Sequence, residues 1–149
     1  TEITPEVEGI WKDIVDQETG GEAAKGRDPY KAVSPAGALG KAQIMPGNIP
    51  DWSMRTLGRE ITSKQFINNP DLQDMISKNM MQEMFDKAMK FTGGDAKESA
   101  RRVSAEWYGG PSALNKMDST VEQAGGFPSR KKYIDQVADK STARQLGIS

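Results

Sequence analysis

The acidic residue best placed to do chemistry in this sequence is Glu18. Val7, Ile10, Trp11, Ile14 and Val15 recur at helical spacing, and Glu18 follows Ile14 by four positions and Val15 by three. It therefore falls on the apolar face of the helix, where a carboxyl group must point to a core or a cleft. Desolvation, and the macrodipole near a helix C-terminus, both favour the neutral acid. A general acid needs that state to protonate a glycosidic oxygen. The alternative is that Glu18 reaches solvent at a frayed helix end.

The residue types that are missing narrow the chemistry further. The 149 residues include no Cys and no His. Thiolate nucleophiles, Cys-based zinc sites, Ser-His-Asp triads and His-ligated metals are therefore excluded. Proton transfer is left to carboxylates, Lys or Tyr, and carboxylates are the residues that cleave glycosides. We expect neither a metal nor a cofactor.

The charge balance and hydropathy set limits on the partners. Lys and Arg number 20 and Asp and Glu 21, for a formal net charge of -1. This balance does not favour a nucleic-acid partner. No apolar run approaches the roughly 20 residues of a membrane span. The first residues, Thr1-Glu2-Ile3, include neither an initiator Met nor a signal-peptide pattern, so we expect a processed chain or a domain of a longer protein.

The elements that must position these groups are helical almost throughout, and we expect one all-α domain over residues 1–149. The first helix is expected to start at Pro5, behind a Thr4 N-cap, and to stop at Gly20-Gly21. A short helix is expected over 38–45, another from near Pro50, and a third from the Thr62–Gln65 capping box. The longest is expected from Asn69-Pro70 to Gly93-Gly94, and the next one behind Asp95. A loop is expected over 22–38, and a final helix around Tyr133. The Met-rich stripe of the longest helix is expected to fill the core.

Three blocks of sequence share their order and spacing with a known domain. The blocks are Gln17-Glu18-Thr19-Gly20-Gly21, Ala32-Val33-Ser34-Pro35-Ala36-Gly37-Ala38 and Gly40-Lys41-Ala42-Gln43-Ile44-Met45-Pro46. They resemble the soluble lytic transglycosylase (SLT-type) domain, whose pattern is Glu-Ser-Gly-Gly, then Ala-x-Ser-x-x-Gly-Ala-x-Gly-Leu-Met-Gln-x-Met-Pro. The resemblance implies a lysozyme-like helical fold, close to goose-type lysozymes, with the glycan strand lying in a cleft.

The resemblance also assigns site residues. Glu18 matches the catalytic acid, and Thr19, Ser34, Gln43 and Met45 match positions expected to contact the sugars. The block Ala105-Glu106-Trp107-Tyr108-Gly109-Gly110-Pro111 resembles an Ala-x-Tyr-Asn-x-Gly element, in which either Trp107 or Tyr108 takes the place of the functional Tyr. Tyr133 resembles the Tyr of a closing Tyr-Val-x-x-Val element.

Some positions depart from the pattern. Thr19 stands for Ser, Lys41-Ala42 stands for Leu-Met, the loop between Glu18 and Ser34 is longer, and the Glu that often precedes the closing Tyr is absent. These departures concern substrate contacts more than the chemistry.

The reaction that the resemblance implies is cleavage between N-acetylmuramic acid and N-acetylglucosamine in peptidoglycan, giving 1,6-anhydro ends. Two alternatives remain open. A hydrolytic muramidase would need a second carboxylate to hold water, for which Asp28 and Asp51 are candidates. A non-catalytic module would bind glycan or form part of a larger assembly. The expected place of action is the cell wall, reached from outside by a phage virion protein or within the periplasm by a mature enzyme or a secretion component.

Overall fold

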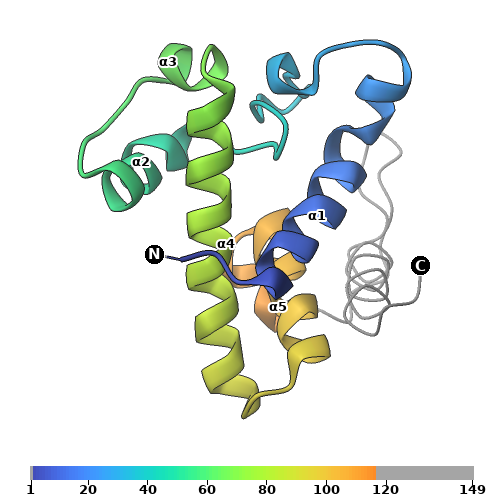
Figure 1. Cartoon of the computed structure of the whole chain (residues 1–149), viewed down its shortest axis with the longest axis vertical. Coiled ribbons are helices and arrows are strands. Elements are labelled where there is room, and N and C mark those ends of the chain that lie inside the picture. Colours follow the sequence, from blue (N-terminus) through green and yellow to red (C-terminus); the bar gives the residue numbers. More distant parts are fainter. Residues whose placement is uncertain (1, 117–149) are drawn as a thin grey trace. The chain divides into compact units, whose positions relative to one another are not determined.

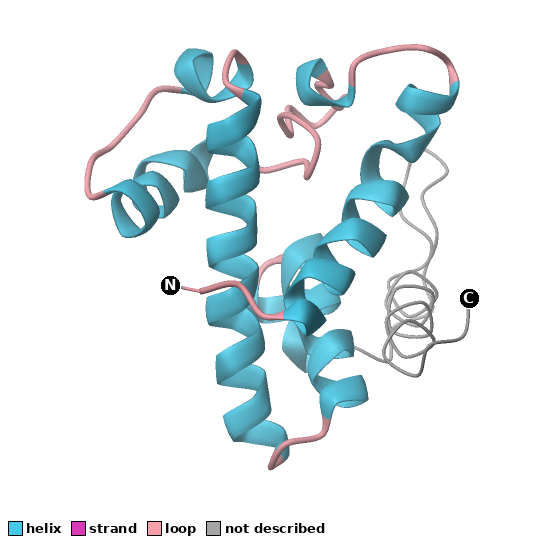
Figure 2. Ribbon diagram, viewed as in Figure 1, coloured by secondary structure: helices cyan, strands magenta, loops and turns pink. Residues whose placement is uncertain are grey.

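The structure, a computed structural model, describes residues 2–116, and in this part the chain consists of helices joined by loops, with isolated β-bridges (Figures 1 and 2). The elements are α1 (Pro5–Ala24), η1 (Pro29–Lys31), η2 (Pro46–Asn48), α2 (Ile49–Leu57), α3 (Ser63–Ile67), α4 (Pro70–Thr92), α5 (Ala96–Gly109) and η3 (Pro111–Lys116). The all-α class predicted from the sequence is confirmed for these residues. The final helix expected around Tyr133 lies outside them.

The chain divides into two compact units, with divisions after Ile3, inside α1 and inside α4. Of the described residues, the first unit comprises 2–3 and Ile14–Met80, and the second comprises Thr4–Asp13 and 81–116. Buried apolar side chains of the first unit include Ile14, Ile44, Ile49, Ile61, Phe66 and Ile76, and those of the second include Val7, Ile10, Met81, Phe85, Ala100 and Val103. Buried apolar side chains are thus present in both units. The single domain expected over residues 1–149 stays a prediction.

The predicted apolar stripe of α4 is confirmed. Ile76, Met80, Met84 and Ala88 are all buried, and Leu72 is partly buried. Because these positions recur every four residues, one side of the helix lies against the protein interior. The methionines of this stripe fill the core, as their unbranched side chains allow.

The helix starts and stops read from the sequence are confirmed at several places. The Thr4 hydroxyl accepts a hydrogen bond from the Val7 N–H at 3.4 Å, ahead of Pro5. Thr62 and Gln65 form the expected capping box of α3. At the end of α4, Gly93 and Gly94 have φ of 69° and 95°, which L side chains rarely adopt, so the helix stops there.

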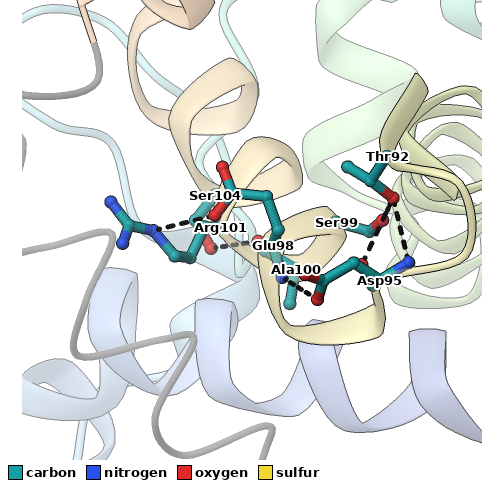
Figure 3. Close-up of polar contacts among 7 residues, drawn as sticks. All are labelled: Thr92, Asp95, Glu98, Ser99, Ala100, Arg101 and Ser104. Carbon is teal, nitrogen blue, oxygen red and sulfur yellow. Dashed lines mark hydrogen bonds and ion pairs between the residues drawn. The ribbon is translucent and has the colours of Figure 1, made fainter.

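The junction between α4 and α5 is held by short-range polar contacts (Figure 3). The Asp95 carboxylate caps α5 by accepting the Glu98 N–H at 3.0 Å, and its own N–H donates to the Thr92 hydroxyl at 3.2 Å. The Thr92 and Ser99 hydroxyls lie 2.9 Å apart, which gives the buried Ser99 a partner. The N-cap predicted at Asp95 is thus confirmed.

The predicted stop at Gly20-Gly21 is wrong, because α1 continues to Ala24. A glycine inside a helix costs only about 1 kcal/mol relative to alanine, and neighbouring helical residues can offset it. The left-handed conformation that ends a helix comes later, at Gly26 with φ of 77°. Gly20 instead leaves room for its neighbour, since a Cβ there would lie 2.7 Å from the Asp16 carboxylate.

The helix expected over 38–45 is also wrong, because this segment forms two tight antiparallel turns about Leu39. Leu39 exchanges hydrogen bonds of 2.8 and 2.9 Å with Ile44, and a second bridge joins it to Val33. Gly40 and Gln43 have φ of 78° and 57°. These left-handed conformations are incompatible with a continuous right-handed helix. The apolar residues of this segment therefore lie on turns and not along one face of a helix.

Candidate active site

Glu18 lies on α1 in the first unit, and its side chain is partly buried. The sequence placed this carboxyl group on the apolar face, and its exposure is intermediate. Because α1 ends at Ala24, Glu18 is more than one turn from the helix C-terminus. The macrodipole acts mainly within the last turn, so the dipole part of the sequence argument does not hold here. The partial burial of Glu18 is the part of that argument that the structure supports.

Thr19, the next residue, joins α1 to the turn over residues 40–43. Its side chain is 3% exposed, and its hydroxyl lies 2.8 Å from the Lys41 carbonyl oxygen and 3.1 Å from that of Val15. Both oxygens are acceptors, so the single hydroxyl proton is shared between them. Thr19 was expected to contact the sugars. In the structure it holds two of the motif blocks together, and the sugar contact stays a prediction.

The loop residues of the motif are turned partly inward. The Ser34 hydroxyl accepts the Ala38 N–H at 3.0 Å, which closes the first turn. The Gln43 side-chain amide donates to the Gly40 carbonyl at 2.8 Å across the second turn. Gln43 keeps a positive φ that costs a non-glycine residue roughly 1–2 kcal/mol, and strain of this kind collects at functional sites. Met45 follows with 44% of its side chain exposed.

Gln73 of α4 is a buried polar residue that the sequence analysis did not identify. It is 3% exposed, and its amide nitrogen donates to the carbonyls of Tyr30 at 2.9 Å and Phe66 at 3.1 Å. Its oxygen accepts the Lys41 N–H at 3.0 Å. One side chain thus ties α4 to η1, to α3 and to the turn over residues 40–43, which we call the motif turn. The available signal was that Gln73 and Ser77 precede the buried Met80 and Met84 at helical spacing.

A second group that the sequence analysis missed lies beside Gln73. The Tyr30 hydroxyl donates to the Asp74 carboxylate and lies 3.0 Å from each oxygen, while the Lys41 ammonium lies 4.9 Å from the centre of the Tyr30 ring. Burial, followed by the bond and the charge of Asp74, raises the pKa of Tyr30 to about 12. Burial also raises the pKa of Asp74, against the opposing effects of Tyr30 and Lys41. Tyr30, Lys41 and Asp74 therefore form one coupled polar group next to the motif turn.

The aromatic residues expected in the cleft belong to the second unit or lie outside the residues that the structure describes. Trp107 and Tyr108 are partly buried residues near the end of α5, which is part of the second unit. Tyr133 lies outside the described residues. Within the first unit, the structure bonds Thr19, the neighbour of Glu18 in the sequence, to the motif turn.

Asp28 and Asp51, the candidates for a water-holding second carboxylate, both have local structural roles. The Asp28 carboxylate accepts the Tyr30 N–H at 3.0 Å and caps η1. Asp51 forms an ion pair with Arg55 at 3.1 Å, one turn along α2. Both side chains are exposed.

Two further limits hold for residues 2–116. No group of three or more Asp and Glu side chains there lies close enough to hold a metal ion. None of the helices that the structure describes is long and apolar enough to cross a membrane. Compared with known protein families, curated proteins and solved structures, the chain matches none.

Proposed function

We propose that this chain is a peptidoglycan lytic transglycosylase with a lysozyme-like fold, in which Glu18 is the single catalytic acid. The observation that carries the proposal is the hydrogen bond between the Thr19 hydroxyl and the Lys41 carbonyl at 2.8 Å. It joins the block that contains Glu18 to the block over residues 40–46, which precede and follow a long loop in the sequence. Blocks that the resemblance assigns to one site are thus in contact.

The chemistry of the proposal needs one carboxyl group. Glu18 protonates the oxygen that leaves the anomeric carbon of N-acetylmuramic acid, and the C1–O bond breaks. The N-acetyl oxygen of the substrate stabilises the positive charge that develops at C1. The Glu18 carboxylate then takes the proton of the C6 hydroxyl, and the O6–C1 bond closes the 1,6-anhydro ring. Glu18 ends protonated, as it began, and no water is consumed.

The product masses test this proposal. The protein is incubated with purified peptidoglycan, and the released muropeptides are analysed by mass spectrometry. A transglycosylase gives products lighter by one water than those of a muramidase. Glu18→Gln keeps the shape of the side chain but cannot act as an acid, so we expect release to fall by about 10²–10⁴-fold. Binding to the insoluble glycan should be retained.

The control is Glu22→Gln, which makes the same chemical change one turn further along α1. Glu22 pairs with Arg27 at 2.9 Å at the surface, so release by this variant should match that of the wild type. Full-mass reducing ends would instead identify a hydrolase and direct attention to Asp28 and Asp51. Equal release by the wild type and Glu18→Gln would contradict the proposed role of Glu18. Binding without release by the wild type would identify a glycan-binding module.

The setting we propose is the bacterial cell wall, reached by a virion protein or within the periplasm. What supports it is the glycan substrate of the proposed reaction. The remainder of a larger virion or secretion protein is the partner proposed beside the glycan strands.

A further inference from the structure

We propose that Gln73 is a positioning residue for the catalytic acid, acting through the Lys41 backbone and the Thr19 hydroxyl. The inference rests on the proposed function and extends it to a residue outside the motif blocks. It is carried by a chain of hydrogen bonds that runs from α4, through the turn over residues 40–43, to α1.

The Gln73 amide is buried and fully hydrogen-bonded. Both hydrogens and the oxygen of its buried amide have partners: the Tyr30 and Phe66 carbonyls accept, and the Lys41 N–H donates. Two carbonyls and one N–H fit only one orientation of an amide, because its nitrogen can only donate and its oxygen only accept. The side chain is therefore fixed in place. A buried amide with all its partners also resists displacement, since each lost bond would leave a buried polar group unsatisfied.

The Gln73 side chain packs closely against Gly40 of the motif turn. A Cβ on Gly40 would lie 2.2 Å from the Gln73 oxygen and 2.7 Å from its amide carbon. Gly40 also has φ of 78°, so glycine is required there both for the backbone conformation and for the approach of Gln73. The turn is thus built around this side chain.

The motif turn is also hydrogen-bonded to α1, at the residue next to Glu18. The Lys41 backbone is held at its N–H by Gln73 at 3.0 Å and at its C=O by the Thr19 hydroxyl at 2.8 Å. Thr19 is adjacent to Glu18 on α1, so its bond fixes the rotation of the helix at the residue next to the acid. An error of about 1 Å in the position of a reacting group can cost about 10²-fold in rate. Loosening Gln73 should therefore lower turnover although Gln73 does not touch the substrate.

The test compares Gln73→Met with Gln82→Met. Gln82 is a matched control on the same helix: it is 2% exposed, and its amide accepts from the distant Thr4 N–H at 2.9 Å and donates to Asp86 one turn along α4. Its partners do not include the motif turn. Both substitutions should lower the melting temperature, and assays are run well below the lower of the two. We expect Gln73→Met to lower kcat by about 10–100-fold with KM changed less than about twofold. Gln82→Met should leave kcat near that of the wild type.

A second pair of variants tests the path and does not depend on Gln73→Met folding. Thr19→Val keeps the shape of the side chain but removes the hydroxyl, whereas Thr19→Ser keeps the hydroxyl. We expect Thr19→Val to lower kcat as Gln73→Met does, and Thr19→Ser to restore most of it. Because both residues act through Lys41, the double variant Gln73→Met/Thr19→Val should be close to the slower single variant.

The outcomes separate the two proposals. If the wild type releases anhydro products and Gln73→Met behaves as Gln82→Met does, the positioning role is overturned and the proposed function stands. Multiplying effects in the double variant would equally overturn the shared path. If the wild type releases no anhydro product, the proposed function fails, and the inference fails with it.

Discussion

At Asp74, burial and hydrogen bonding act in opposite directions on one carboxyl group. Burial disfavours the carboxylate, whereas the Tyr30 hydroxyl and the positive charge of Lys41 favour it. The pKa of Asp74 lies above its ordinary value of 3.8, so the effect of burial is the larger. The folded protein therefore holds the Asp74 proton more tightly than the unfolded chain does. This residue makes the stability of the unit that contains Glu18 depend on pH.

We predict that the wild type loses stability relative to Asp74→Asn as the pH rises from about 3 to about 7. A folded-state pKa above the unfolded value contributes stability that is fully present below 3.8 and is lost as the pH rises through the folded-state pKa. Asparagine has no proton to lose and keeps an oxygen that can accept the Tyr30 hydroxyl. Thermal midpoints of both proteins across this range measure the difference.

Tyr30→Phe is the companion variant for this pair. It removes the donor from a partly buried carboxylate, so at neutral pH it should cost about 1–3 kcal/mol. The same substitution in the Asp74→Asn protein should cost less, because no charge is left without its partner. Parallel stability curves for the wild type and Asp74→Asn across the pH range would contradict the predicted linkage.

At the scale of the elements, the sequence predicted those helices whose ends carry a local signal. Thr62 and Gln65 cap α3, and Asp95 caps α5, through bonds to residues three positions away. The segment over 38–45 was predicted as a helix because the spacing of its apolar residues fits a helical face. Its backbone forms turns because Gly40 and Gln43 have positive φ. Periodicity records which side chains are buried but not how the backbone brings them there.

The same reasoning explains what was found of the candidate site. Glu18 was identified from its place on an apolar face, and the motif turn from the spacing of its residues. Gln73, Tyr30 and Asp74 were not identified, because their partners are far away in the sequence. Gln73 and Lys41 are 32 positions apart, and Tyr30 and Asp74 are 44 positions apart. Contacts at such separations depend on the tertiary fold.

The motif turn supplies a prediction at this scale. We expect Gly40→Ala to lower the free energy of unfolding by about 3 kcal/mol or more, because it adds backbone strain and displaces the buried Gln73 amide. Gly37→Ala is the matched control, since Gly37 has φ of 91° but open space around a new Cβ. Strain alone should cost it about 1–2 kcal/mol. Urea unfolding measures both, and equal losses would contradict the close approach of Gln73 to Gly40.

At the scale of the whole molecule, the two compact units share their longest helices. α1 contributes its residues 5–13 to one unit and its residues 14–24 to the other, and α4 divides in the same way after Met80. Independent domains are usually joined by an exposed, flexible linker with few contacts. Here two of the three divisions fall inside continuous helices, α1 and α4. Because helix formation is cooperative along the chain, unfolding of one part of α4 should propagate into the other.

We therefore predict one cooperative unfolding transition for both units, which is also what the expected single domain requires. Gly40→Ala lies in the first unit and Gln82→Met in the second, and each should shift the whole transition by about 2–4 °C per kcal/mol lost. Far-UV circular dichroism reports on all helices, while fluorescence of a variant that keeps only Trp52 reports on the first unit. Coincident midpoints in both probes, and in both variants, are the expected result. A Gln82→Met transition that moves in circular dichroism but not in Trp52 fluorescence would show that the units unfold separately. The chain would then be two domains that share helices rather than one.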